Sequence, residues 1–140
     1  MTTKQMGFFG SLLKHYSEPW MLKEEQIQAS IDEHIKRNWE ILKFLKERGM
    51  ELRSALLTEH HFMTARQLEA GKLAIALDKK GFKILEMTPA ETKEGADGWA
   101  IIGEMEMTLE AAADPATSEE LIQLAAAFDS KYEGWGAELD

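Results

Sequence analysis

The chain has 140 residues, of which 44% are hydrophobic and 29% charged, a composition that is typical of a folded globular protein and argues against general disorder. It contains no cysteine, which excludes disulfides, thiolate zinc sites and a cysteine nucleophile. The formal net charge is −9, and the excess is concentrated: residues 1–85 carry 14 basic and 11 acidic side chains, whereas residues 86–140 carry 2 and 14. An acidic half repels nucleic acid and attracts basic protein surfaces. The alternative is that the acidic residues only keep the protein soluble.

Residues 1–21 are expected to be an N-terminal extension to a single domain that spans residues 22–140. The extension has an apolar run from Met6 to Leu13, which is shorter than the roughly 18 residues that a membrane span requires. No small-residue cleavage site of a signal peptide follows it. We therefore expect a cytoplasmic protein without a membrane span, whose first residues dock or fray, or else contact a membrane surface or a partner.

Residues 22–48 are predicted to form one long helix. Its apolar residues recur at helical spacing, at Ile27, Ile31, Ile35, Leu42 and Leu45. Gly49 follows at the position of a C-capping glycine. The apolar stripe must be buried against the rest of the domain or against a partner.

Residues 53–139 are predicted to form a βαββαβ core. Strands are expected at 53–62, 82–87, 99–110 and 132–139. The two helices should open at the capping boxes Thr64 to Gln67 and Thr117 to Glu120. In the first helix, Leu68, Leu73, Ile75 and Leu77 are expected to face the core. This order predicts an α+β ferredoxin-like two-layer sandwich, with both helices on one face of an antiparallel sheet.

The cluster Glu59-His60-His61 is the most suggestive one for chemistry. Neighbouring side chains of a strand point to opposite faces, so His60 and His61 cannot easily bind one metal ion together. We expect His60 to be buried with a hydrogen-bond partner, and Glu59 and His61 to face outward. A metal site or a catalytic site built on these three residues is the less favoured alternative.

Two other features bear on binding. Glu104 and Glu106 lie two residues apart on a strand, so both project from one face, which is either solvated or binds the cations of a partner; acid–base or Mg²⁺ chemistry is less favoured. Trp135 lies between Gly134 and Gly136 and is either a core residue or an anchor in an interface.

Two separated motifs resemble one protein family. Leu57-Thr58-Glu59-His60-His61-Phe62 precedes a helix ending at Lys80-Gly81-Phe82, and a helix from residue 121 leads into Lys131-Tyr132-Glu133-Gly134-Trp135-Gly136. Both are similar to segments of the regulator of ribonuclease E activity B family, with Glu133 where Asp is usual. The resemblance covers roughly residues 24–140. It implies a ferredoxin-like fold and an inhibitor that binds the Arg-rich scaffold part of ribonuclease E.

We therefore expect a non-enzymatic modulator that docks on a basic segment of a ribonuclease E-like protein. The residues expected to carry the binding are Glu59, His61, Glu104, Glu106 and Trp135. No cofactor, no metal and no direct contact with nucleic acid are expected. The alternative is a ferredoxin-like module that binds a small molecule or self-associates through its open sheet face, without catalysis.

Overall fold

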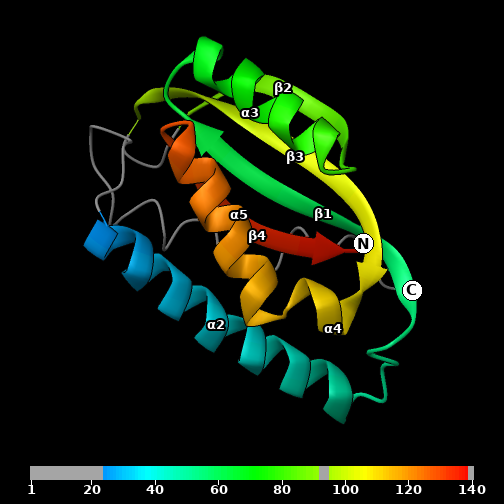
Figure 1. The fold of residues 1–140 in the computed structure, drawn as a ribbon. Helices are drawn as coiled ribbons and strands as arrows, with labels where there is room; N and C mark the ends of the chain where they lie inside the picture. Colours follow the sequence, from blue (N-terminus) through cyan, green and yellow to red (C-terminus); the bar gives the residue numbers. More distant parts are fainter. Residues whose placement is uncertain (1–23, 92–94, 139–140) are drawn as a thin grey trace.

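The structure, a computed structural model, describes residues 24–91 and 95–138. In chain order these form α2 (Glu24–Glu47), β1 (Ala55–Thr64), α3 (Gln67–Lys79), β2 (Lys83–Glu91), β3 (Asp97–Thr108), α4 (Leu109–Ala112), α5 (Pro115–Ala127) and β4 (Ser130–Ala137). The strand order is β2-β3-β1-β4, and every neighbouring pair is antiparallel. The predicted α+β sandwich of ferredoxin-like topology is therefore confirmed (Figure 1).

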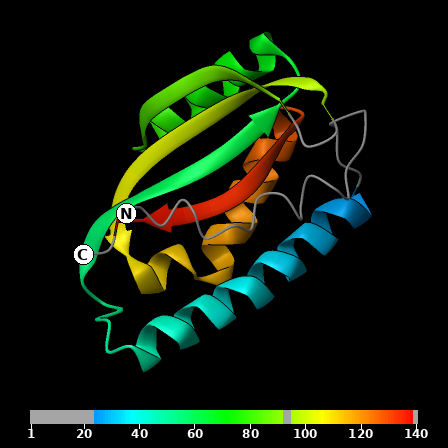
Figure 2. The ribbon, with the colours of Figure 1, turned by 180° about the vertical axis from the view of Figure 1, so that it is seen from behind.

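The described helices lie on one side of the sheet. α3 and α5 cover one face, and α2 runs alongside α5 near the β4 edge (Figure 1). Figure 2 shows the opposite face of the sheet, on which no helix of the described ranges packs. We call this second face the outer face. Paired residues in an antiparallel ladder share a face, so the outer face includes Glu59 and His61 of β1 with their partners Glu104 and Ile102 of β3.

The main core lies between the sheet and the helices α3 and α5. Its fully buried side chains include Phe62, Leu73, Leu77, Ile101 and Leu121. A second cluster joins the C-terminal half of α2 to α4 and the end of β4 and includes Leu45, Leu109 and Trp135. The apolar stripe of α2 is thus buried within the chain itself.

Asn38 fixes the position of α2 against the rest of the fold. Its side-chain amide donates to Ser118 Oγ of α5 at 3.0 Å. Its carbonyl oxygen accepts from the indole N–H of Trp135 on β4 at 3.1 Å. All three residues are buried, so the two bonds satisfy polar groups that would otherwise be costly to bury. One amide therefore ties α2 to both a helix and a strand of the sandwich.

Both predicted capping boxes are wrong. Thr64 belongs to β1, and α3 begins after Arg66, which makes no side-chain cap. α5 begins two residues before the predicted box, at Pro115, where Asp114 Oδ1 accepts from Ala116 N at 2.8 Å. Pro at the first helical position lacks an N–H that would be unpaired there, which explains why a helix can start at Asp114-Pro115.

The predicted glycine cap at Gly49 is confirmed, and Gly81 caps α3 in the same way. Gly49 and Gly81 both have positive φ, at 80° and 103°. Met50 N donates to Leu45 O after α2, and Phe82 N donates to Leu77 O after α3, each at 3.0 Å. This is the hydrogen-bond pattern of a Schellman motif.

The predicted core face of α3 is only half right. Leu73 and Leu77 are fully buried, but Leu68 and Ile75 are 68% and 59% exposed. The two buried residues are four apart and the two exposed ones are seven apart, so each pair follows its own side of the helix. Ala70, which is fully buried, completes the inward side and lets the helix approach the sheet closely.

Candidate functional site

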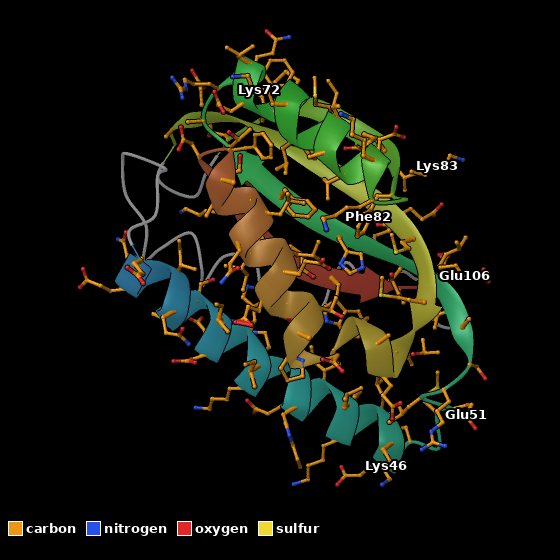
Figure 3. The ribbon with its side chains drawn as sticks, viewed as in Figure 1. Lys46, Glu51, Lys72, Phe82, Lys83 and Glu106 are labelled. Carbon is orange, nitrogen blue, oxygen red and sulfur yellow. The ribbon has the colours of Figure 1, made fainter. Side chains whose placement is uncertain are left out.

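His60 is the centre of a buried hydrogen-bonded chain on the helix side of the sheet. Its Nδ1 lies 2.9 Å from Tyr132 Oη, and its Nε2 lies 2.9 Å from Thr58 Oγ1. The Thr58 hydroxyl in turn donates to the backbone carbonyl of Met105 at 2.8 Å. The His60 ring also stands edge-on to the ring of Phe82, and the two ring centroids are 5.3 Å apart (Figure 3). The expectation of a buried His60 with a partner is confirmed.

The chain of donors fixes which nitrogen of His60 carries the proton. The single hydroxyl hydrogen of Thr58 is used on Met105, so Thr58 Oγ1 must accept, and His60 Nε2–H must donate. His60 Nδ1 is then free to accept the hydroxyl hydrogen of Tyr132. Burial, helped by the nearby His61, lowers the pKa of His60 to about 3, so the ring is neutral as this arrangement requires. Every polar atom of the ring is satisfied, and His60 has a structural role here.

A second histidine packs on the same tyrosine. His34 of α2 stacks on Tyr132 with centroids 5.2 Å apart, and burial, with Arg37 nearby, lowers its pKa to about 4. Burial also raises the pKa of Tyr132. Two neutral histidines and one protonated tyrosine therefore form a polar layer in the core.

Glu59 and His61 lie on the outer face, as predicted. Glu59 Oε1 and His61 Nε2 are 3.7 Å apart, and the side chains are only 23% and 15% exposed. His60 points to the opposite face of the same strand. The three residues thus cannot converge on one ion, and no group of three or more potential ligands in the described ranges is arranged to hold a metal.

Glu104 and Glu106 also lie on the outer face, in register with β1. Glu104 is directly opposite Glu59 on one side and Lys83 of β2 on the other, and Glu106 is opposite Leu57. Glu104 is half-buried and Glu106 is exposed. Figure 3 shows Glu106 pointing away from the sandwich at the rim of the sheet. In the described part of the chain, neither carboxylate has a basic group within 4.0 Å.

A β-bulge shapes the same face at the β4 edge. The pairing of β1 with β4 shifts between His61 and Phe62, which leaves Glu133 as the extra residue. Gly134 next to it has a φ of 129°, a conformation that glycine adopts readily. Burial raises the pKa of Glu133 to about 8, although Lys131 nearby lowers it. Gly136 lies opposite Glu59 and Gly134 opposite His61, and neither glycine presents a side chain on this face.

Trp135 does not lie on this face, which corrects its assignment to the binding residues. It pairs with His60, is 1% exposed and donates its indole N–H to Asn38. The register of the two strands decides this, since paired residues share a face and His60 faces the helices. Trp135 is a core residue that anchors α2, and four residues remain as candidates: Glu59, His61, Glu104 and Glu106.

Comparison with known proteins agrees with this fold. A family model described as "RraB: Regulator of ribonuclease activity B" matches residues 35–137. The chain belongs to the RraB family. The match runs from within α2 to the last residue of β4 and contains all four candidate residues of the outer face. The resemblance inferred from the two motifs is therefore confirmed at the level of the family.

Individual RraB proteins are similar over most of their length. A regulator of ribonuclease activity B from Psychromonas ingrahamii is 28% identical over 83% of this chain and 96% of its own length. One from Photobacterium profundum is 31% identical over 76% of this chain and 81% of its own length. One from Shewanella denitrificans is 26% identical over 79% of this chain and 85% of its own length. In the part of this chain that the structure describes, no helix is long and apolar enough to cross a membrane.

Three residues of the site were missed from the sequence: Tyr132, His34 and Asn38. Tyr132 and His60 are 72 residues apart, and Asn38 and Trp135 are 97 apart. His34 and Asn38 do carry a local signal, because both lie on the apolar side of a helix with Ile31 and Leu45. A polar residue in such a stripe requires a buried partner.

Proposed function

We propose that this RraB-family protein regulates a ribonuclease by binding it, without catalysing a reaction of its own, as one domain of residues 22–140 in the cytoplasm. The family description and the names of three relatives support the regulation of ribonuclease activity. The satisfied hydrogen bonds of His60 support the absence of catalysis, since they leave this histidine no bond for a substrate.

The proposed partner is a ribonuclease E-like protein, contacted through a basic segment. The observation that carries this proposal is the pair of carboxylates at Glu104 and Glu106. They project from one side of β3 and have no cation within 4.0 Å in the described ranges. Arginine side chains bind carboxylates in charge-assisted, often bidentate pairs, so an arginine-rich segment fits this face.

The arrangement of carboxylates on the outer face also favours an external cation. Glu104 lies directly across from Glu59, and like charges directly opposite in a sheet destabilise it. A guanidinium placed between or beside them would remove that repulsion on binding. Glu59 and His61, which are mostly covered, would contribute at the border of such a contact and not at its centre.

Charge reversal tests the proposed face. The double variant Glu104→Lys/Glu106→Lys should weaken binding to the arginine-rich segment of a ribonuclease E-like protein at least about tenfold, because each reversal replaces attraction with repulsion. The matched control is Glu110→Lys/Glu119→Lys, which changes the net charge equally on exposed residues of α4 and α5. Affinity is measured by calorimetry at low salt, with thermal unfolding of each variant as a check on folding.

Two results would contradict this proposal. Equal weakening by both double variants would mean that only the net charge matters. Affinity that does not fall as the salt concentration rises from 50 to 300 mM would show that ion pairs do not carry the contact; these concentrations bracket a Debye length of roughly 8 Å at physiological ionic strength.

A further inference from the structure

The outward side of α2 carries a row of cations around one exposed tryptophan. Lys36, Trp39, Lys43 and Lys46 are three or four residues apart, which places them on one side of the helix, and we call them the basic stripe. The exposed Glu40 and Glu47 border the stripe on the same side. Trp39 is 69% exposed, and the three lysines are exposed too. Figure 3 shows Lys46 at the end of α2, directed away from the sandwich.

The packing of α2 does not use the basic stripe. The helix buries its other side, with Ile31 in the main core and Leu45 in the second cluster. No side chain of the described residues lies within 4.0 Å of the three lysines as an ion-pair partner. Exposed aromatic side chains beside cations are features of interaction surfaces.

Charge is segregated along α2. Residues 24–33 contain four acidic and no basic side chains, whereas residues 36–48 contain five basic and two acidic ones. The positive half coincides with the exposed aromatic residues Trp39 and Phe44, and the Arg48 guanidinium lies 4.2 Å from the Phe44 ring centroid. An anionic ligand that offers a flat or apolar group to Trp39 would fit this half of the helix.

We propose that the basic stripe binds single-stranded RNA. Phosphates of a single strand pair with lysines, and an unstacked base lies on an exposed aromatic ring, which is how sequence-tolerant single-strand binders work. The stripe has both components, with lysines one turn before and one turn after Trp39. This inference concerns a different face from the proposed ribonuclease contact and does not rest on it.

Two other anionic partners fit less well. An anionic membrane surface would lie along the whole helix and meet its acidic first half, which it would repel. An acidic peptide would satisfy the lysines but has no group that requires an exposed indole. A single strand can follow the basic half alone and uses both features.

The net charge of −9 does not forbid this contact. The acidic excess belongs to residues 86–140, which include β3, α4, α5 and β4, whereas the three lysines of the stripe are exposed residues of α2. Charges farther apart than a Debye length of roughly 8 Å are largely screened at physiological salt. The charges close to the stripe, and not the net charge of the protein, therefore determine its electrostatic interaction with a phosphate backbone.

Fluorescence anisotropy with a labelled 12-nucleotide oligouridylate tests this inference. The full chain should bind it, and Lys36→Gln/Lys43→Gln/Lys46→Gln should lower the affinity about tenfold or more through lost phosphate contacts. Trp39→Ala should lower it about tenfold by removing a stacking surface. The matched control, Lys72→Gln/Lys79→Gln/Lys83→Gln, removes three exposed lysines from α3 and β2 and should leave the affinity within about twofold.

Three outcomes would overturn the inference. The first is no binding of the oligonucleotide at low salt, whether or not vesicles containing phosphatidylglycerol bind. The second is an equal loss of affinity in the control variant, which would assign the effect to net charge. The third is binding of polyglutamate as tight as that of RNA and equally sensitive to the stripe substitutions, which would make the surface a site for acidic polypeptides. Unfolding temperatures of the variants verify that each one is folded.

Discussion

Tyr132 keeps His60 in one tautomer by donating its hydroxyl hydrogen to Nδ1. Tyr132→Phe removes this donor and leaves a buried acceptor unpaired, so we expect it to lower the free energy of unfolding by about 1–3 kcal/mol. Thr64→Val is the contrasting variant, because the Thr64 hydroxyl is buried without a hydrogen-bond partner. It should be neutral or stabilising. Urea unfolding of both variants measures the difference, and a Tyr132→Phe protein as stable as the parent would contradict the assigned chain of donors.

The buried titratable residues predict how stability depends on pH. Burial lowers the pKa of His34 to about 4 and that of His60 to about 3 from 6.5, so below pH 6.5 the unfolded chain binds protons that the folded chain does not. Stability therefore falls as the pH falls, by up to about 1.4 kcal/mol per pH unit for each histidine. Burial raises the pKa of Glu133 to about 8 from 4.5, so between these values the folded chain binds the extra proton, and stability falls as the pH rises.

The two trends together predict maximum stability near pH 6.5, where the two half-protonated histidines of the unfolded chain bind as many protons as the folded chain retains on Glu133. Glu133→Gln should abolish the loss between pH 6.5 and 8 and should be more stable than the parent above pH 8. Chemical unfolding at a series of pH values from 5 to 9 tests this. Parallel curves for the parent and Glu133→Gln over the whole range would show that Glu133 is not a buried carboxyl with a raised pKa.

The alternation of β1 explains which site residues could be predicted. Successive side chains of a strand point to opposite faces, so the sequence alone places His60 on the inner face and Glu59 and His61 on the outer one. The same rule applied to β4 does not predict which face Trp135 is on. Its neighbours are glycines, which have no side chain to show which face is apolar. Partners such as Tyr132 for His60 come from a strand 72 residues away, which no local pattern reveals.

At the scale of elements, helix starts depend on which polar side chain is free to cap. Asp114 caps α5, whereas Thr117, the capping residue of the predicted box, lies inside the helix. Asp114→Ala should thus cost about 1 kcal/mol of stability, the usual value for a lost N-cap. Thr117→Ala changes a residue inside the helix and should cost much less. Thermal unfolding of the two variants decides, and a larger loss for Thr117→Ala would contradict the observed start at Pro115.

The elements that could be predicted are those whose periodicity is strong. The twelve-residue β3 and the long α2 both appear within two residues of their predicted ends. The short helix α4 was not predicted, because four residues are too few for a periodic signal. The order of elements limits the sheet to few topologies, which is why the ferredoxin-like arrangement followed from local patterns.

At the scale of the whole molecule, the fold separates two charged surfaces. The outer face of the sheet carries Glu104 and Glu106, and the basic stripe lies on α2 beyond α5 (Figures 1 and 2). A regulator with this layout can contact a basic protein segment with one surface and an anionic polymer with the other. Because the surfaces share no residue, charge changes on one should leave the affinity of the other nearly unchanged.

Carboxyl footprinting of the complex tests the central claim most directly. Exposed carboxylates are coupled to an amine with a carbodiimide, in the presence and absence of the proposed ribonuclease E-like partner, and the labelled residues are identified by mass spectrometry. We predict that labelling of Glu104 and Glu106 falls on complex formation, while Glu110 and Glu119 on the helix side react as before. Protection of Glu110 and Glu119 with unchanged labelling of Glu104 and Glu106 would contradict the account.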